Sequence, residues 1–376
     1  MALGKTIGLS DIINARGTFT PLGVSRSHVE VQAAVAKALG AYVLIEGMQE
    51  AVSAHLVEFS GAEAGTVVHC AAAAVTLAVA ACMTMENADA VARLPDADGL
   101  ARRVLLPACH NVNYGQPIEQ AVRLAGGQPN LVGTKAEWDL ADLGHALSHD
   151  DICCLLLVSS RLTGGNGPDM AAAVALAKDR NIPVIIDGAA QDMRVRQLVS
   201  TGADLVILSG QKYLAGPTAG LVVGSRAAVT AVRAQEKGIG RGMKASKEAI
   251  AGTIAALEIR ANLDIETWQI DQTRKLERFI HEVRGLPGVE TFSQPDPTGL
   301  PFARVVLELA PEFDAGKVIH HLQSFDPPIF VMDHMVRSNK LVLEITSLRE
   351  DELDYVTMRL KGLLTQRPDR VLRIDY

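Results

Sequence analysis

Two apolar runs in the middle of the chain constrain its fold most strongly. The first run, Ile182–Ile186, ends at an acid, Asp187, and about one helix later a second run, 204–208, leads to Ser209 and Lys212 in a glycine-rich turn. Continuous apolar runs of this length are typical of parallel strands that are buried on both faces, and the carboxyl ends of such strands share one edge of the sheet. The pattern therefore predicts that Asp187 and Lys212 lie at the same sheet edge.

This pair of side chains suits pyridoxal 5′-phosphate (PLP). A lysine can form an imine with the aldehyde of the cofactor, and an acid can keep its pyridine nitrogen protonated so that the ring accepts electrons. Ser209 lies three residues before Lys212 and could offer its hydroxyl to the phosphate. Because a single charged residue at the end of a strand more often caps a helix or faces solvent, the prediction rests on the combination.

Apolar runs alternate with helical segments over most of the chain, which favours a large α/β domain with a mainly parallel sheet. Further strands are expected at 103–106, 152–158 and 221–225, with helices near 70–85 and over 169–179. A long helix, broken once, is expected from about 246 to 284. The less regular order beyond it, with strands near 302–309, 328–332 and 340–346, favours a smaller α+β domain.

Composition narrows the classes of function. The hydrophobic content of 48% with 21% charged residues is typical of a globular protein, and the net charge of −7 argues against a nucleic-acid partner. The five cysteines show no metal-binding spacing, so we expect no metal site and a reducing, cytoplasmic location. The uncharged segment 64–85 is alanine-rich and lacks basic or aromatic flanks, so we expect a buried helix there and no membrane span.

Four segments resemble one family of enzymes. The Lys212 region is similar to the PLP-lysine region of fold-type I enzymes, and IINARGTFTPLG (12–23), GAEAGTVVHCAAAAVTLA (61–78) and GRGMKASKEAIAG (240–252) resemble the selenocysteine synthase-like and D-glucosaminate-6-phosphate ammonia lyase family. The resemblance implies the fold-type I PLP-dependent transferase fold (aspartate aminotransferase-like). It also implies a homodimer or larger homo-oligomer. We expect an N-terminal arm and helix at 1–45, a large PLP-binding α/β domain at 46–250, and a linker helix with a small C-terminal α+β domain at 251–376.

The resemblance also suggests residues that would hold the cofactor. Backbone N–H groups of Cys70 and Ala71, at the start of the alanine-rich helix, would bind the phosphate, although the same residues could simply cap a core helix. His110 would lie over the PLP ring, unless it is an ordinary loop histidine, and Tyr114 is a second candidate for that position. Gln191 would reach the phenolic oxygen of PLP.

Several cationic residues are candidates for substrate binding. Arg349 lies in the region where related enzymes keep the arginine that binds the substrate carboxylate, and the alternative is a surface arginine beside two acids. Arg16 and Arg161 are further candidates. Arg241 and Lys244 could contact a phosphate on PLP or on the substrate, or they could be solvated charges at the start of a helix.

The reaction implied by the resemblance is an ammonia-lyase reaction. Its substrate would be a 2-amino-3-hydroxy acid, such as an amino sugar acid or its phosphate, and its products a 2-oxo acid and ammonia. The same apparatus also performs racemisation, aldol cleavage, β-replacement and selenium or sulfur transfer, and a non-catalytic relic of the fold is a further alternative.

Overall fold

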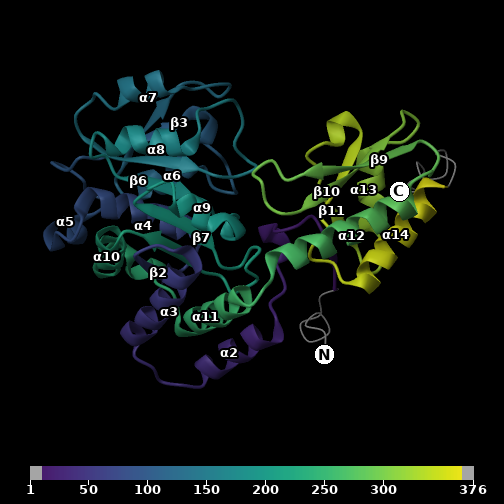
Figure 1. Cartoon of the computed structure of the whole chain (residues 1–376), viewed down its shortest axis with the longest axis horizontal. Helices are drawn as coiled ribbons and strands as arrows, with labels where there is room; N and C mark the ends of the chain where they lie inside the picture. Colours follow the sequence, from purple (N-terminus) through teal and green to yellow (C-terminus); the bar gives the residue numbers. More distant parts are fainter. Residues whose placement is uncertain (1–10, 366–376) are drawn as a thin grey trace. The chain divides into compact units, whose positions relative to one another are not determined.

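The computed structural model describes residues 11–365, which form two compact units (Figure 1). The larger unit is residues 27–262, and the smaller unit combines 11–26 with 263–365. Helix α2 (Val29–Leu39) packs against α11 (Lys247–Ala261) within the larger unit. The expected division into an N-terminal arm and helix (1–45), a large PLP-binding domain (46–250) and a linker helix with a small C-terminal domain (251–376) stays a prediction.

The larger unit is built on a seven-stranded sheet with the order β2-β8-β7-β6-β5-β3-β4. The five strands from β7 to β4 run parallel, whereas β8 is antiparallel to both of its neighbours, β7 and β2. The strands are β2 (Ala64–Val68), β3 (Arg103–Pro107), β4 (Gln128–Val132), β5 (Ile152–Val158), β6 (Val184–Asp187), β7 (Leu205–Ser209) and β8 (Gly220–Gly224). This mainly parallel sheet confirms the predicted α/β fold.

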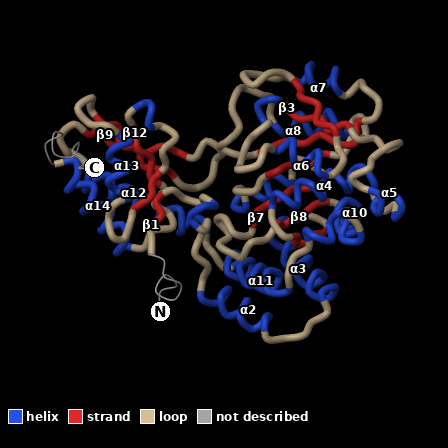
Figure 2. Tube along the Cα trace, turned by 180° about the vertical axis from the view of Figure 1, so that it is seen from behind, coloured by secondary structure: helices blue, strands red, loops and turns tan. Residues whose placement is uncertain are grey.

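Helices cover both faces of this sheet, as Figure 2 shows from behind. One core lies between the sheet and α4 (Ala71–Thr84), α6 (Ile118–Leu124) and α10 (Arg226–Ala234). The other core involves α2, α3 (Ile45–Ser60), α7 (Leu140–Ala146), α8 (Met170–Lys178), α9 (Val195–Val199) and α11. The remaining helical segments of this unit are α5 (Ala88–Arg93), η2 (Ala108–His110), η3 (Asp192–Arg194), η4 (Gln235–Lys237) and η5 (Ile239–Met243).

Helix α4 forms within the uncharged, alanine-rich segment and is buried over most of its length. A helix that is apolar on all sides needs cover on all sides, and here the sheet and the surrounding helices α5, α6 and α10 provide it. Among the described residues, no helix has both the length and the apolar character needed to cross a membrane.

The smaller unit contains a three-stranded antiparallel sheet with the order β12-β10-β9 and a separate parallel pair, β1 with β11. Its strands are β1 (Ile13–Ala15), β9 (Val289–Pro295), β10 (Ala303–Leu309), β11 (Ile329–Val331) and β12 (Lys340–Leu343). Its helical segments are η1 (Thr20–Leu22), α12 (Ile265–Val283), α13 (Ala315–Gln323), η6 (Val336–Ser338) and α14 (Glu350–Leu364). The expected break in the long helix falls between α11 and α12, where the Asp264 side chain caps α12.

Candidate active site

Asp187 and Ser209 are the last residues of the adjacent parallel strands β6 and β7. Three backbone hydrogen bonds join the segments at these strand ends: Ser159 N–H to Asp187 O (2.8 Å), Gly188 N–H to Ile207 O (2.9 Å) and Ser209 N–H to Ala189 O (3.0 Å). Both strand ends are therefore fixed at one edge of the sheet.

Lys212 lies in a tight turn directly after β7. Its N–H group donates to the Ser209 carbonyl oxygen at 3.4 Å, and its own carbonyl oxygen accepts from Ala215 N–H at 3.0 Å. The turn closes where Gly216 N–H donates to Gly210 O at 2.8 Å, and a Cβ on Gly216 would lie only 3.0 Å from that oxygen. This close approach of the backbone favours glycine, and the turn holds Lys212 near the end of β7.

Burial changes the electrostatics of both groups. Burial raises the pKa of the Asp187 carboxyl, and the nearby Lys212 and a hydrogen bond from Ala189 N–H (3.0 Å) act against it. Burial also lowers the pKa of the Lys212 amine, an effect that Asp187 and Asp192 oppose and Arg161 reinforces. Both shifts favour the uncharged forms, and a neutral amine is the form that attacks an aldehyde.

The register of β2, β8 and β7 brings the expected phosphate-binding residues to one place. Gly220 pairs with Ser209 on one side and with Val68 on the other, and Val68 forms a bridge with Lys244. A Cβ on Gly220 would lie 2.3 Å from the carbonyl oxygen of Cys70. The sheet therefore gathers Ser209, the start of α4 and the segment before α11.

Cys70 is the N-cap of α4, and its Sγ accepts a hydrogen bond from Ala73 N–H at 3.4 Å. Ala71 is the first residue of the helix. His69 N–H donates to the Met243 carbonyl oxygen at 2.8 Å. This hydrogen bond holds the segment that contains the exposed Arg241 next to the start of α4. Capping by Cys70 leaves its backbone N–H available to an anion, so capping and phosphate binding are compatible.

His110 and Tyr114 follow β3. The His110 Nδ1 atom accepts a hydrogen bond from Val158 N–H (3.1 Å), and its ring packs edge-on against Trp138 with the centroids 5.7 Å apart. Burial lowers the pKa of His110 to about 4, so its imidazole is neutral at neutral pH. The Tyr114 hydroxyl is buried and has no hydrogen-bond partner among the described residues. Burial raises the pKa of Tyr114, and nearby Asp187 and Cys70 raise it further.

The remaining predicted residues lie in different surroundings. Gln191 is buried, and its Oε1 atom accepts from Arg194 Nη1 at 3.0 Å. Arg16 and Arg349 belong to the smaller unit. Arg16 forms a two-pronged ion pair with Asp333, with both N–O distances 2.8 Å. Arg349 pairs with Asp351 (3.2 Å) and Glu352 (3.0 Å), which agrees with the alternative of a surface arginine beside two acids. Its binding of a substrate carboxylate stays a prediction.

Two further charged residues near this sheet edge, Asp192 and Arg260, were not predicted from the sequence. The Asp192 side chain is fully buried, and its Oδ2 atom lies 2.6 Å from Arg260 Nη1. Asp192 follows Asp187 by five residues, so its place near the strand end was a usable signal. Arg260 lies within α11 and shows no local pattern that could have identified it.

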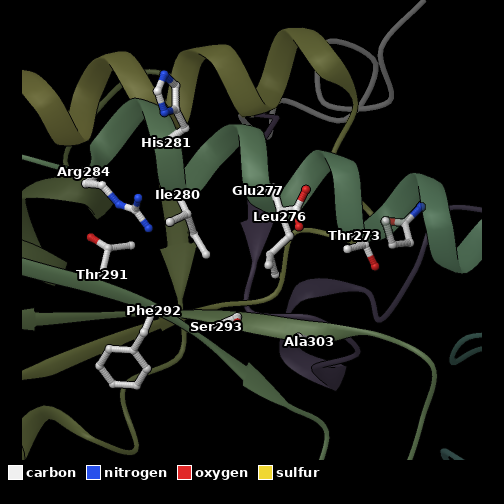
Figure 3. A pocket seen from close by; sticks show the side chains of 11 residues that line it. Thr273, Leu276, Glu277, Ile280, His281, Arg284, Thr291, Phe292, Ser293 and Ala303 are labelled. Atoms are coloured by element: carbon white, nitrogen blue, oxygen red, sulfur yellow. The ribbon is translucent and has the colours of Figure 1, made fainter.

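A cavity of about 580 Å³ lies elsewhere, between α12 and β9 of the smaller unit (Figure 3). Leu276 and Ile280 of α12 point toward the sheet in this view, whereas Phe292 points away from the helix. None of the residues that line the cavity was a predicted site residue. A cavity without convergent perturbed groups does not compete with the sheet edge as a catalytic site.

The residues at the sheet edge fit PLP. They include a buried acid for the pyridine nitrogen, a half-buried amine with a lowered pKa, and Ser209 beside a helix N-terminus for the phosphate. The buried Tyr114 hydroxyl without a partner is the kind of polar atom that a bound ligand satisfies.

Comparisons with known proteins agree with this geometry. The model of the family described as beta-eliminating lyase matches residues 46–291. D-glucosaminate-6-phosphate ammonia lyase from Salmonella typhimurium (strain 14028s / SGSC 2262) is 30% identical over 97% of this chain and 98% of its own length. A 5′-C-glycyluridine monooxygenase-decarboxylase from a Streptomyces species is 29% identical over 95% of this chain and 91% of its own length.

A solved structure of D-glucosaminate-6-phosphate ammonia lyase superposes with a TM-score of 0.86 at 29% identity, covering 99% of this chain and 100% of that chain. The comparisons confirm the expected fold-type I architecture and PLP as the cofactor. The chain therefore belongs to the beta-eliminating lyase family of PLP-dependent enzymes.

Proposed function

We propose that this protein is a PLP-dependent ammonia lyase that converts an amino sugar acid phosphate, a 2-amino-3-hydroxy acid, to a 2-oxo acid and ammonia. The observation that carries the proposal is the meeting of Asp187 and Lys212 at the end of two neighbouring parallel strands. The similarity to D-glucosaminate-6-phosphate ammonia lyase over nearly the whole chain supports the choice of reaction and substrate class.

The net reaction needs an acid and a base but no external oxidant. The substrate loses the proton on Cα and the hydroxyl on Cβ, and subsequent hydrolysis replaces the C–N bond by a C=O bond. The water lost from Cβ equals the water consumed in releasing ammonia, so the substrate and the two products balance. When bound, PLP supplies an electron sink conjugated to the substrate nitrogen.

The residues of this chain take separate parts in that reaction. Lys212 would bind the cofactor through Nζ, and once released, its neutral amine would remove the Cα proton. Asp187 would accept a hydrogen bond from the protonated pyridine nitrogen, which would satisfy a carboxylate otherwise buried at a cost. Ser209, Cys70 and Ala71 would hold the cofactor phosphate.

The outer residues would hold the ring and the substrate. Tyr114 or His110 would cover the ring, and Gln191 would approach the phenolic oxygen. Exposed Arg241 and Lys244, beside the start of α4, supply positive charge that could bind a substrate phosphate. Arg16, Arg161 and Arg349 are the candidates for the substrate carboxylate.

The test is product analysis with purified protein, PLP and D-glucosaminate 6-phosphate. We expect ammonia and a 2-oxo acid in equal amounts, and borohydride reduction should attach a pyridoxyl group to Lys212. The variant K37A, which changes an exposed lysine on α2, is the matched control for K212A. Ammonia release by K212A, or a pyridoxyl group on another lysine, would contradict the proposal.

A second reaction is favoured by the similarity to the 5′-C-glycyluridine monooxygenase-decarboxylase. Such a reaction consumes oxygen and releases carbon dioxide, whereas an ammonia lyase does neither. Oxygen uptake with 5′-C-glycyluridine, in the absence of ammonia release from sugar acids, would favour this second candidate.

We further propose that the protein works in the cytoplasm as a homodimer or larger homo-oligomer without a nucleic-acid partner. Five free thiols suit a reducing compartment, and the net charge of −7 repels nucleic acid. Leu39, Tyr42 and Leu44 expose large apolar side chains around the turn between α2 and α3, which supports contact with a second copy. Light scattering on the wild type and on Y42S/L44S measures the molar mass of each in solution. We expect an oligomeric wild type and a smaller species for the variant, and a monomeric wild type would contradict the proposed oligomer.

A further inference from the structure

Arg260 connects the two loops that carry the candidate catalytic residues. Its Nη1 atom donates to Asp192 Oδ2 and its Nη2 atom to the carbonyl oxygen of Tyr213, both at 2.6 Å. Asp192 follows Asp187 by five residues, and Tyr213 directly follows Lys212. One guanidinium on α11 therefore ties the loop after β6 to the turn after β7.

The ion pair of Arg260 and Asp192 is buried, but one of its carboxylate oxygens has no hydrogen-bond partner among the described residues. The side chains of Arg260 and Asp192 are 8% and 0% exposed. Asp192 Oδ1 is buried and accepts no hydrogen bond from any described residue. An unpaired buried carboxylate oxygen is costly, so a donor is expected to approach it during function.

Lys212 is a suitable donor. The charged groups that shift the pKa of its amine are Asp187 at the end of β6, Asp192 in η3 and Arg161 after β5. Asp187 would be engaged with the cofactor nitrogen, and Arg161 carries the same charge as a protonated lysine. Asp192 is therefore the acid left to accept from Lys212 when the released amine becomes protonated.

We propose that Arg260 and Asp192 form a positioning pair for Lys212, in which Arg260 holds the turn of Lys212 and Asp192 Oδ1 accepts a hydrogen bond from Lys212 Nζ once that amine has taken the substrate proton. The inference rests on the proposed function, in which Lys212 carries the cofactor. The amine takes the proton from the substrate Cα, and the resulting ammonium donates to Asp192 Oδ1. Neither residue touches the substrate, so both act through Lys212.

The first experiment measures how fast PLP associates with cofactor-free protein as a function of pH. Only the neutral amine of Lys212 reacts, so the midpoint of the profile reports its pKa. Removing the charge with D192N should move the midpoint about 1 pH unit lower, because the ammonium form loses an acidic neighbour. D179N, which changes an exposed acid at the end of α8, should leave the midpoint unchanged.

The second measurement separates kcat from KM. A misplaced amine slows proton removal without changing substrate contacts, so D192N and R260K should lower kcat about 10- to 100-fold and leave KM within about 2-fold. Lysine keeps the positive charge but lacks the two Nη atoms that bind the two acceptors, so R260K tests the connection without removing the charge. Circular dichroism and thermal melting establish that each variant is folded.

The outcomes separate the two proposals. If borohydride fixes PLP on Lys212 of the wild type but D192N and wild type show the same pH profile and kcat, the positioning pair is overturned and the proposed function stands. If no lysine adduct forms on Lys212, the proposed function itself fails. An equal loss in D179N and D192N would also overturn the specific role of Asp192.

Discussion

Each unit contains a buried cluster of charged side chains. The two clusters differ in whether their charged atoms have hydrogen-bond or ion-pair partners. In the smaller unit the arginine cluster consists of Arg304, Asp296 and Glu344, all almost completely buried. Arg304 lies 2.7 Å from a carboxylate oxygen of each acid. Burial opposes ionisation of Asp296, yet hydrogen bonds from Thr298 and Arg304 hold its pKa below the usual value.

In the larger unit the lysine cluster consists of Lys212, Asp187 and Asp192. Here burial dominates, so the pKa values of both acids are raised and that of the lysine is lowered. One carboxylate oxygen of Asp192 is left without a partner. The contrast teaches that a satisfied buried network supports a fold, whereas an unsatisfied one at a sheet edge is prepared for a ligand and for catalysis.

The largest expected effect concerns the lysine cluster. K212A removes both the cofactor attachment and the proposed base, so we expect kcat to fall by roughly 10⁴-fold or more. Thermal melting should show that the cofactor-free variant is as stable as cofactor-free wild type, since no structural bond of the Lys212 side chain is lost. A large loss of stability would mean that this cluster also supports the fold, which would break the comparison.

The arginine cluster should show the opposite behaviour. R304M leaves two buried carboxylates without their partner and should reduce the free energy of unfolding by about 3–5 kcal/mol. The matched control is R278M, because Arg278 also pairs with several acids, Glu282, Glu350 and Asp354, but is 42% exposed. We expect that control to lose less than about 1 kcal/mol in urea unfolding. Equal losses for both variants would contradict the structural role given to burial.

A third prediction compares isosteric changes in the two clusters. D187N should lower kcat by about 10²- to 10³-fold but stabilise the cofactor-free protein by about 0.5–2 kcal/mol at pH 7. The folded pKa of Asp187 is raised, so its ionisation costs stability above the unfolded pKa, and the gain in D187N should fade as the pH falls toward 4.

D296N should behave in the reverse sense. The folded pKa of Asp296 is lowered, so its contribution is present above the unfolded pKa and is lost as the pH falls through the folded value. Melting temperatures between pH 3.5 and 8 measure both trends. Parallel trends for D187N and D296N would show that the two clusters do not differ.

The smallest expected effect is that of Y114F. Removing a buried hydroxyl that has no partner should change the stability of the cofactor-free protein by less than about 1 kcal/mol. If the hydroxyl is satisfied by bound PLP, the variant should weaken PLP binding by about 10-fold, measured by equilibrium dialysis. An unchanged PLP affinity would remove Tyr114 from the cofactor site.

Local sequence patterns were sufficient for the sheet edge. The apolar runs before Asp187 and Ser209 form β6 and β7, and both residues end their strands. The sequence could not predict that Cys70 caps α4 through its thiol, or that the His110 ring bonds to Val158 N–H. Such contacts depend on the orientation of single side chains, which periodicity does not specify.

The sequence by itself determined the mainly parallel sheet and the strand ends that lead to Asp187, Ser209 and Lys212, because continuous apolar runs that alternate with helical segments are typical of buried parallel strands. Only the tertiary structure decided which residues complete the site. Arg260 meets Asp192 across 68 positions, and Lys244 forms a bridge with Val68 in the edge strand β2. Burial then decided the protonation of these groups, since desolvation depends on everything that surrounds a charge and not on its neighbours in sequence.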